Sequence, residues 1–597
     1  MDKPNELAYN DRAKAAAFDF PTRQVTMNDP TPATPIIVPA SPRATVQVRF
    51  PHGRILEGPT GTPLEHFVHC AHQPGQPPDV AALIDGRLAE LTRAVRHDIS
   101  VEPLSIVDND GARIYQRSLA FLLIAAVNEL FPSARVLVDH SLTMGGLFCQ
   151  IEGRPPLTAD EVADVEARMR SIVEADEPIV RREVLVAEAM ALFDGQHYAD
   201  KVRLLKFRRK ETLPLYTLRG VSDYFFGYMV PSTRYLYQFA LRPYPPGVLL
   251  CYPRRRAPFQ LPEFQDYPKL AAMFRQHLEW MRIMDIEDVG ALNEAITHGR
   301  MQEAILVNEA LHEQRIAEIA SDIVRRRGQV RLILIAGPSS SGKTTFAKRL
   351  SVQLLAYGIR PFALGMDDYF VDRAHTPRDA QGNFDFEALG ALDRPLLNQH
   401  LLALMAGQEV HLPRFSFQKG QREPGPTVRL SDDTLILAEG IHGLNPNLLP
   451  EVPPERVYRI YVSALTQLNI DDHNRIPTSD TRLLRRIVRD ARFRGYTARE
   501  TVGRWESVRR GETEYIFPYQ ENADTMFNSA LVYELAVLKP FVEPLLLQIE
   551  PNGLAYVEAR RLLAFLQWVL PFEVDLVPDN SLLREFIGGS SLREFTV

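Results

Sequence analysis

The chain has 597 residues, 45% of them hydrophobic and 24% charged, and a formal net charge of −7. This length exceeds what one hydrophobic core supports, so we expect three or four domains. The balance of hydrophobic and charged residues excludes disorder of the whole chain. The negative net charge gives no indication that the chain as a whole binds nucleic acid. Cys70, Cys149 and Cys251 form neither a metal spacing nor a disulfide framework. No apolar run suits a membrane span or a signal peptide, so we expect a cytoplasmic protein without a membrane partner.

The N-terminal stretch divides into two parts. Residues 1–42 are polar and then Pro/Thr/Ala-rich, which buries too little apolar surface to offset ordering entropy, so we expect a flexible arm. Residues 43–110 contain the alternating run TVQVRF and a hairpin signal at Asp85-Gly86, which predict a small α+β module. The segments VQVRFPHGR, GTPL and ALIDGRLAEL resemble the TGS domain, a ubiquitin-like module of threonyl-tRNA synthetases and some GTPases.

Residues 111–255 resemble the second additional domain of threonyl-tRNA synthetase, which hydrolyses mischarged tRNA. The segments RSLAFLLIAAVNELFP and VSDYFFGYMVPST carry this resemblance. The family's hydrolytic or zinc site needs imidazole and thiolate donors. Phe and Met, which stand at three of these positions here, cannot replace them, so we expect the fold without the hydrolysis. We favour an interaction or regulatory platform, with an RNA-contacting surface as the alternative; the basic cluster at 206–210 is either an RNA patch or a solvated face. The family's His and Cys positions are Arg117, Phe121, Phe225 and Met229 here.

Residues 256–328 carry apolar residues at helical spacing, which predicts a helical connector. The next stretch, VRLILIAGPSSSGKTT at 330–345, is a predicted buried strand followed by G-x-x-x-x-G-K-[ST] and a helix. Glycines let backbone N–H groups surround a phosphate, the lysine reaches the β- and γ-phosphates, and Thr344 can hold Mg²⁺. We therefore predict binding of ATP or GTP with Mg²⁺ by Gly337, Ser339, Ser340, Ser341, Gly342, Lys343, Thr344 and Thr345.

Further short apolar runs follow this phosphate loop (P-loop) at 362–366, 434–438 and 457–462, alternating with helical patterns. This order predicts an α/β fold, a parallel sheet with helices on both faces, whose functional groups gather at the carboxyl ends of the strands. Asp367 arrives there as the candidate for orienting or deprotonating an acceptor hydroxyl, with Asp368 as its rival. Glu439 is the candidate Mg²⁺ ligand beside Thr344.

An arginine-rich helix is predicted at 480–495, with Arg482, Arg485, Arg489 and Arg492 along one stripe and Arg486 beside it. Such a face is either solvated or, beside a P-loop, a lid that closes over the triphosphate; we favour the lid.

The region 329–548 resembles the uridine kinase/phosphoribulokinase family of P-loop kinases. The resemblance is carried by GPSSSGKTT, DDYF, NFDFEALGALD, PRFSF, ILAEGIHGL and DTRLLRRIVRDARFRG. It implies that Asp367 is the catalytic base, that lid arginines lie within 482–494, and that the acceptor meets Tyr369, Glu387, Phe415 and Arg482. Phe415 and Gly420 stand where uridine kinases have the Tyr and His that read the base, which puts uridine specificity in doubt. The whole order of domains resembles the long bacterial uridine kinase-like proteins.

Two segments fall outside this pattern. The insertion at 463–479 carries Asp471, Asp472, His473 and Asn474, which are either metal ligands or a substrate-contacting or structural loop. The extension at 549–597 contains an apolar helix that packs either on the kinase region or on a second subunit.

We predict a kinase that transfers the γ-phosphate of ATP to a small-molecule hydroxyl, with a uridine- or cytidine-like nucleoside 5′-hydroxyl as the leading acceptor. Its chemistry is assigned to Asp367, Lys343, Arg486, Arg489 and Arg494. The alternatives are a kinase for another polyol or sugar phosphate and an NTP-dependent RNA-associated regulator. The acceptor, the preferred nucleotide, homo-oligomer formation and the purpose of the N-terminal domains stay open.

Overall fold

The computed structural model describes residues 43–142, 146–379, 382–416 and 418–595. Residues 45–597 form one compact unit, distinct from residues 1–44. The predicted flexible arm, residues 1–42, lies outside the described ranges. Within those ranges, every helix is too short or too polar to cross a membrane.

The first module is a mixed sheet with one helix. Its elements are β1 (Thr45–Arg49), β2 (Ile55–Pro59), α1 (Leu64–Ala71), β3 (Asp79–Ile84), β4 (Arg87–Ala89) and β5 (Ile99–Ser105), and its strand order is β2-β1-β5-β3-β4. The hairpin predicted at Asp85-Gly86 joins β3 to β4, and both turn residues take positive φ, 48° and 75°. The short turn therefore fixes the register that places Ile84 opposite Arg87.

Residues 109–251 form helices and two antiparallel sheets, ordered β10-β9-β8 and β11-β12-β7-β6. The elements are α2 (Asn109–Leu130), β6 (Arg135–Leu142), β7 (Gly146–Glu152), α3 (Ala159–Glu174), β8 (Val180–Leu185), α4 (Val186–Gly195), α5 (Ala199–Leu205), β9 (Thr212–Leu218), β10 (Val221–Asp223), β11 (Ala240–Tyr244) and β12 (Gly247–Cys251). The buried face of α2 shares one hydrophobic cluster with the first module, so the two predicted N-terminal regions pack as a continuous core.

The predicted connector is helical, with α6 (Pro268–Ile283), α7 (Val289–Thr297) and α8 (Met301–Arg325). Ile316, Ile319 and Ile323 of α8 are buried against the strand that precedes the P-loop and its neighbours. Helix α8 is therefore one of the layers that cover the P-loop sheet.

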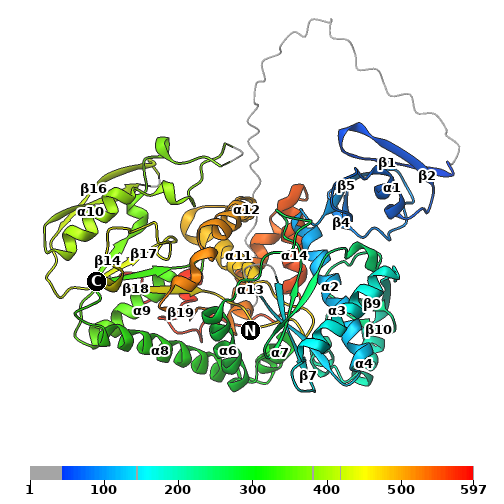
Figure 1. Cartoon of the computed structure of the whole chain (residues 1–597), viewed down its shortest axis with the longest axis horizontal. Helices are drawn as coiled ribbons and strands as arrows, with labels where there is room; N and C mark the ends of the chain where they lie inside the picture. Colours follow the sequence, from blue (N-terminus) through cyan, green and yellow to red (C-terminus); the bar gives the residue numbers. More distant parts are fainter. Residues whose placement is uncertain (1–42, 143–145, 380–381, 417, 596–597) are drawn as a thin grey trace, which may run out of the picture. The chain divides into compact units, whose positions relative to one another are not determined.

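The P-loop region contains a parallel sheet in the order β14-β17-β13-β18-β19, made of β13 (Leu332–Ala336), β14 (Phe362–Gly365), β17 (Ile436–Glu439), β18 (Val457–Ser463) and β19 (Thr525–Asn528). Alternate residues of β13 face opposite layers. Ile333 and Ile335 pack with α8 and α9 (Lys343–Ala356), and Leu332 and Leu334 pack with α10 (Arg394–Met405) (Figure 1). The predicted α/β fold, with helices on both faces of a parallel sheet, is confirmed.

The remaining elements are the antiparallel ribbon of β15 (Val410–Ser416) and β16 (Gln421–Val428), then α11 (Thr478–Arg489), α12 (Ala498–Tyr515), α13 (Glu534–Leu547), α14 (Gly553–Leu566) and α15 (Arg584–Ile587). Buried residues of α11, α13 and α14 form one cluster with residues of α5, α6 and α7. The two halves of the chain are thus joined through a shared core.

A buried ion cluster fixes the insertion onto the N-terminal half. The Lys201 ammonium of α5 lies 2.9 Å from Asp223 and 3.0 Å from Asp471, and all three side chains are at most 2% exposed. The His473 ring also pairs with Asp223 at 2.5 Å. Burial alone would raise the pKa of Asp223, but Lys201 and His473 hold this pKa below its ordinary value. Asp471 and His473 of the insertion therefore have a structural role, one of the roles that the sequence left open.

Lys201→Met should lower the stability of the chain strongly, by roughly 3–5 kcal/mol, because two carboxylates stay buried without their cation. Lys206→Met is the matched control, since its ammonium is half exposed and 3.4 Å from Glu294. The measurement is the urea midpoint of both variants beside wild type. Equal midpoints for the two variants would show that the buried cluster does not support the fold.

Candidate functional site

The P-loop connects β13 to α9 and is built so that only glycine fits at two positions. A Cβ on Gly337 would meet the Val462 carbonyl oxygen at 1.9 Å. Gly342 has φ of +84°, and a Cβ there would lie 2.7 Å from Leu582. The loop can therefore wrap closely at the N-terminus of α9, where free N–H groups and the helix dipole favour an anion.

Side chains of α11 and α12 form hydrogen bonds with the backbone of the P-loop. Arg482 donates to the Ser339 carbonyl at 3.0 Å and to both carboxylate oxygens of Glu512. The Ser339 N–H donates to Glu512 Oε1 at 3.1 Å. Burial would raise the pKa of Glu512, but Arg482 and Arg509 keep it below its ordinary value. Glu512 is thus an ionised brace of the loop, and its sequence context carries no motif that would have marked it.

Arg485 extends this support. It donates to the Ser529 carbonyl at 2.7 Å, pairs with Glu534 at 2.5 Å and approaches the Ser340 carbonyl at 3.5 Å. Arg482 and Arg485 are at most 1% exposed. Neither the favoured lid nor a solvated face describes this half of the helix, because both side chains are buried. Arg482, expected to meet the acceptor, contacts the loop instead. The burial follows from the acidic partners on α12 and α13, which lie outside the motif.

Two carboxylates and a hydroxyl meet at the carboxyl edge of the sheet. Gly365 of β14 and Ile335 of β13 both pair with Glu439 of β17, which brings the ends of these strands together. The Thr344 hydroxyl donates to Glu439 Oε1 at 2.8 Å. Burial, together with nearby Glu585 and Asp367, raises the pKa of Glu439 to about 7. Hydroxyl and carboxylate oxygens are the donors that Mg²⁺ prefers, so Thr344 and Glu439 fit the predicted metal role.

Asp367 and its rival Asp368 differ in their surroundings. Asp368 accepts the backbone N–H of Phe415 at 3.1 Å, which ties it to β15. The Asp367 carboxylate has no hydrogen-bond partner within the ranges that the structure describes, and it is exposed at the sheet edge. Partial desolvation by the surrounding side chains raises the pKa of Asp367, opposed by Lys343 and Arg494. The geometry therefore favours Asp367 as the group that is free to meet a hydroxyl.

The remaining candidate arginines all lie close to one carboxylate, that of Asp490. Helix α11 continues into a π-helical turn, Asp490–Arg494, a distortion that is frequent at functional sites. Asp490 lies 3.3 Å from Arg486, 2.9 Å from Arg489 and 3.8 Å from Arg494. Arg486 also donates to Ser339 Oγ at 2.7 Å, so this group borders the P-loop directly.

The candidate acceptor contacts occupy different places. Glu387 borders the site: Arg486, Lys343 and Asp367 all act on its carboxyl, and burial with Glu512 raises its pKa to about 7. Tyr369 does not, because it is buried and its hydroxyl lies 3.1 Å from His400 Nδ1. Phe415 is nearly buried, with its ring 5.7 Å from that of Phe370.

The C-terminal extension reaches the P-loop, which the sequence left undecided. Glu585 of α15 accepts the Thr345 N–H at 3.3 Å and its hydroxyl at 2.8 Å. The Lys348 ammonium of α9 donates to the Leu592 and Arg593 carbonyls at 2.7 and 3.0 Å. The extension therefore packs on this region of its own chain and places a carboxylate at the N-terminus of α9.

Across the described ranges, no three His, Cys, Asp or Glu side chains are grouped so as to hold a metal ion. Phe121 and Phe225, two of the positions that the sequence resemblance relates to His and Cys donors, are fully buried with ring centroids 4.9 Å apart. Arg117 donates to the Tyr228 carbonyl at 2.6 Å.

Known proteins similar to this chain fall into two groups. Residues 332–536 match the model of the Phosphoribulokinase / Uridine kinase family. A threonine–tRNA ligase of Symbiobacterium thermophilum is 31% identical over 199 residues, 33% of this chain and 30% of the relative. Another, from Acidovorax sp. (strain JS42), is 34% identical over 166 residues, 27% of this chain and 26% of the relative. The chain thus spans about 30% or less of the length of these curated relatives.

Among solved structures, a possible uridine kinase from Bacillus stearothermophilus is 24% identical, with a match that covers 36% of this chain and 98% of that chain at a TM-score of 0.23. Two parts of the chain thus have different relatives: residues 332–536 match the model of the Phosphoribulokinase / Uridine kinase family, and the N-terminal region is similar to part of threonine–tRNA ligases.

Proposed function

We propose that the P-loop region transfers the γ-phosphoryl group of ATP to a hydroxyl of a small molecule, with a nucleoside 5′-hydroxyl as the leading acceptor. One observation carries the proposal: the P-loop, the Thr344–Glu439 pair and the partner-free Asp367 carboxylate gather at the same edge of the parallel sheet. The chain's three cysteines are free, which accords with a reducing cytoplasm as the place of action.

The loop residues fit a bound triphosphate. The Ser340 and Ser341 hydroxyl oxygens are buried and have no hydrogen-bond partner among the residues that the structure describes. Unpaired buried polar atoms are costly unless a ligand satisfies them. The Lys343 ammonium lies against the Pro338 carbonyl at 3.2 Å, beside the loop that would surround the phosphates. When bound, ATP supplies the phosphoryl group and Mg²⁺ neutralises its charge.

The chain's own groups have separable roles in this proposal. Asp367 orients the acceptor hydroxyl and takes up its proton at a carboxylate oxygen. Lys343, Arg486, Arg489 and Arg494 offset the negative charge that develops during transfer. Thr344 and Glu439 would hold the metal ion.

A second acceptor class is favoured by one observation. Phe415, at a position that reads the base in uridine kinases, offers a nearly buried ring and a backbone N–H already bound by Asp368. A site without these polar contacts discriminates poorly between bases. A polyol or sugar phosphate that presents hydroxyls to Glu387 is therefore the second candidate, and an NTP-dependent regulatory role of the whole chain is the third.

An acceptor screen tests the proposal. Mg·ATP is incubated with nucleosides, sugars and polyol phosphates, and products are detected by mass. Asp367→Asn should lower kcat by about 10²–10⁴-fold while ATP still binds, because only the proton acceptor is lost. Lys343→Ala should lose ATP binding as well.

Asp368→Asn is the matched control, since an amide oxygen can still accept the Phe415 N–H. It should keep most of the turnover. Failure of every acceptor, together with unchanged ATP turnover in Asp367→Asn, would exclude a metabolic kinase and favour the regulatory role.

The acceptor KM should depend on pH through Glu387, whose pKa is raised to about 7. The ionised carboxylate accepts hydrogen bonds from acceptor hydroxyls, and protonation removes this capacity. The acceptor KM should therefore rise as pH falls through about 7, and Glu387→Gln should flatten this change. An identical profile in Glu387→Gln would assign the titration to another group.

Removing the carboxylate of Glu585 should strengthen ATP binding. This carboxylate occupies the Thr345 N–H, a donor at the helix N-terminus that a phosphate would also use. Glu585→Gln should lower the Kd of ATP about fivefold, which corresponds to roughly 1 kcal/mol. Glu594→Gln, in the same C-terminal segment but exposed, is the control. Weaker ATP binding in Glu585→Gln would show instead that the carboxylate supports the loop.

A further inference from the structure

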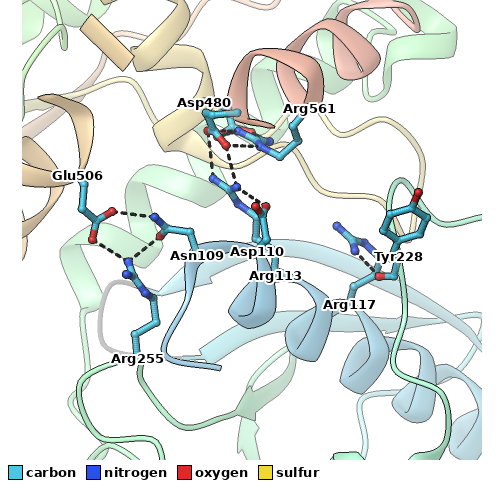
Figure 2. Close-up of polar contacts among 10 residues, drawn as sticks. Asn109, Asp110, Arg113, Arg117, Tyr228, Arg255, Asp480, Glu506 and Arg561 are labelled. Carbon is cyan, nitrogen blue, oxygen red and sulfur yellow. Dashed lines mark hydrogen bonds and ion pairs between the residues drawn. The ribbon is translucent and has the colours of Figure 1, made fainter. Parts of the chain in front are cut away.

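A large cavity lies outside the P-loop site, between the two halves of the chain. Its volume is about 730 Å³, within the range of small-molecule sites, roughly 300–1,000 Å³. It is lined by residues of α2, β9 and α14, by residues 470–477 of the insertion, and by Asp480 at the start of α11. No residue of the P-loop, 337–345, contributes to its lining. Figure 2 shows part of its polar wall, with Arg113, Arg117, Asp480 and Arg561.

The lining is strongly cationic in a chain whose net charge is negative. Nine arginine or lysine side chains line the cavity, against two aspartates. Three of the nine, Arg113, Arg181 and Arg561, pair with carboxylates. The other six have no carboxylate within ion-pair distance in the part of the chain that the structure describes: Arg87, Arg117, Arg208, Lys210, Arg475 and Arg560.

Arg117 is held in place with most of its donors unused. Gly227 has φ of +118°, and a Cβ there would lie 2.8 Å from the Arg117 guanidinium, so the glycine makes room for this group. Its one hydrogen bond within the described residues goes to the Tyr228 carbonyl at 2.6 Å (Figure 2). Burial lowers the pKa of Arg117 to about 10. An anion in the cavity would offset this desolvation.

Arg475 is a second arginine of the cavity wall whose hydrogen-bond donors are unused among the described residues. Its guanidinium makes no hydrogen bond and no ion pair with any residue that the structure describes, although it lines the cavity and burial lowers its pKa. Asp480 and Asp139 act on Arg475 only from beyond ion-pair distance. A half-buried guanidinium without a direct ion pair or hydrogen bond is costly, and a bound anion can compensate for it. Arg117 and Arg475 come from opposite halves of the chain and both reach this cavity.

Aromatic side chains form another part of the wall. The rings of Tyr224 and Trp568 are 5.1 Å apart, and Arg208 lies 4.8 Å from the Trp568 ring centroid. Phe226 and Tyr556 also line the cavity. Flat aromatic faces beside arginines suit a ligand that combines a ring with negative charge.

We propose that this cavity is a second binding site, for a small molecule of the nucleoside monophosphate class, with the phosphate at Arg117 and Arg475 and the base against the aromatic wall. The site is independent of the proposed kinase reaction. It is, however, physically connected to the P-loop: Asp480 accepts two hydrogen bonds from Arg561 at 2.6 and 2.9 Å, and two residues further on Arg482 holds Ser339.

Isothermal titration calorimetry on the full chain tests this site. The P-loop is first saturated with Mg²⁺ and a non-hydrolysable ATP analogue, so that a nucleotide added later reports on a different site. AMP and UMP are then titrated, with adenosine and inorganic phosphate as partial probes. The wild type should bind one monophosphate per chain. Each of Arg117→Gln and Arg475→Gln should weaken binding at least about tenfold, the loss expected for one charge-assisted contact.

Arg459→Gln is the matched control. Arg459 is also half-buried with a pKa lowered by burial, and it lies on β18 outside the cavity. It should bind the monophosphate as the wild type does. Arg475→Gln loses no hydrogen bond of the free protein, so it keeps the test valid if Arg117→Gln fails to fold.

Three outcomes would overturn the proposal. If no monophosphate binds at millimolar concentration, the cavity takes no ligand of this class. If binding persists unchanged in both variants, the ligand lies at the acceptor site of the kinase region. If inorganic phosphate binds as tightly as AMP and UMP, the aromatic wall contributes nothing and the class is wrong. Because the readout is binding with the P-loop saturated, it does not depend on finding a phosphate acceptor.

Discussion

Helix α11 is the element on which the P-loop depends. Arg482 and Arg485 are fully buried beneath the loop and hold its carbonyl groups, and each needs a buried carboxylate, Glu512 and Glu534, to be tolerated there. Removing one partner of such a pair leaves an uncompensated buried charge, which costs more than the pair itself stabilises. The shape of the P-loop is therefore supported by ion pairs whose residues lie far outside the loop's own sequence.

The same helix links the kinase region to the N-terminal half. Its first turn contains Asp480, which binds Arg561, and the insertion just before it is fixed by Lys201 and Asp223. The N-terminal half is consequently part of the structure that positions α11. The N-terminal half thereby shares a buried core and ion pairs with the C-terminal half of the chain.

The C-terminal extension adds a third contact to the P-loop. Leu582 lies close to Gly342, and Glu585 binds the first turn of α9. A carboxylate at a helix N-terminus is favourable in itself, yet it uses a donor that a nucleotide phosphate also needs. The loop is thus bordered by buried arginine pairs and by Glu585, and we propose that nucleotide affinity depends on both.

The sequence alone determined the P-loop, the alternation of four parallel strands with helices, and the arrival of Asp367 and Glu439 at one sheet edge. These features are local: each follows from glycine geometry, apolar periodicity and the fact that parallel strands end together. The fifth strand, β19, and the order of the strands across the sheet were decided by the tertiary structure. The choice between Asp367 and Asp368 as the candidate base also needed the tertiary structure. Asp368 accepts the backbone N–H of Phe415, which lies on a strand distant in the sequence.

Only the tertiary structure decided the rest. Ser339 and Glu512 are 173 residues apart, Thr345 and Glu585 are 240 apart, and His473 and Asp223 are 250 apart. No spacing rule connects such pairs, so Arg482 was assigned to the acceptor and the insertion cluster was left undecided. The sequence does not show whether a charged side chain faces solvent, a ligand or a buried partner. Its surroundings depend on which carboxylates or cavities the completed fold places beside it.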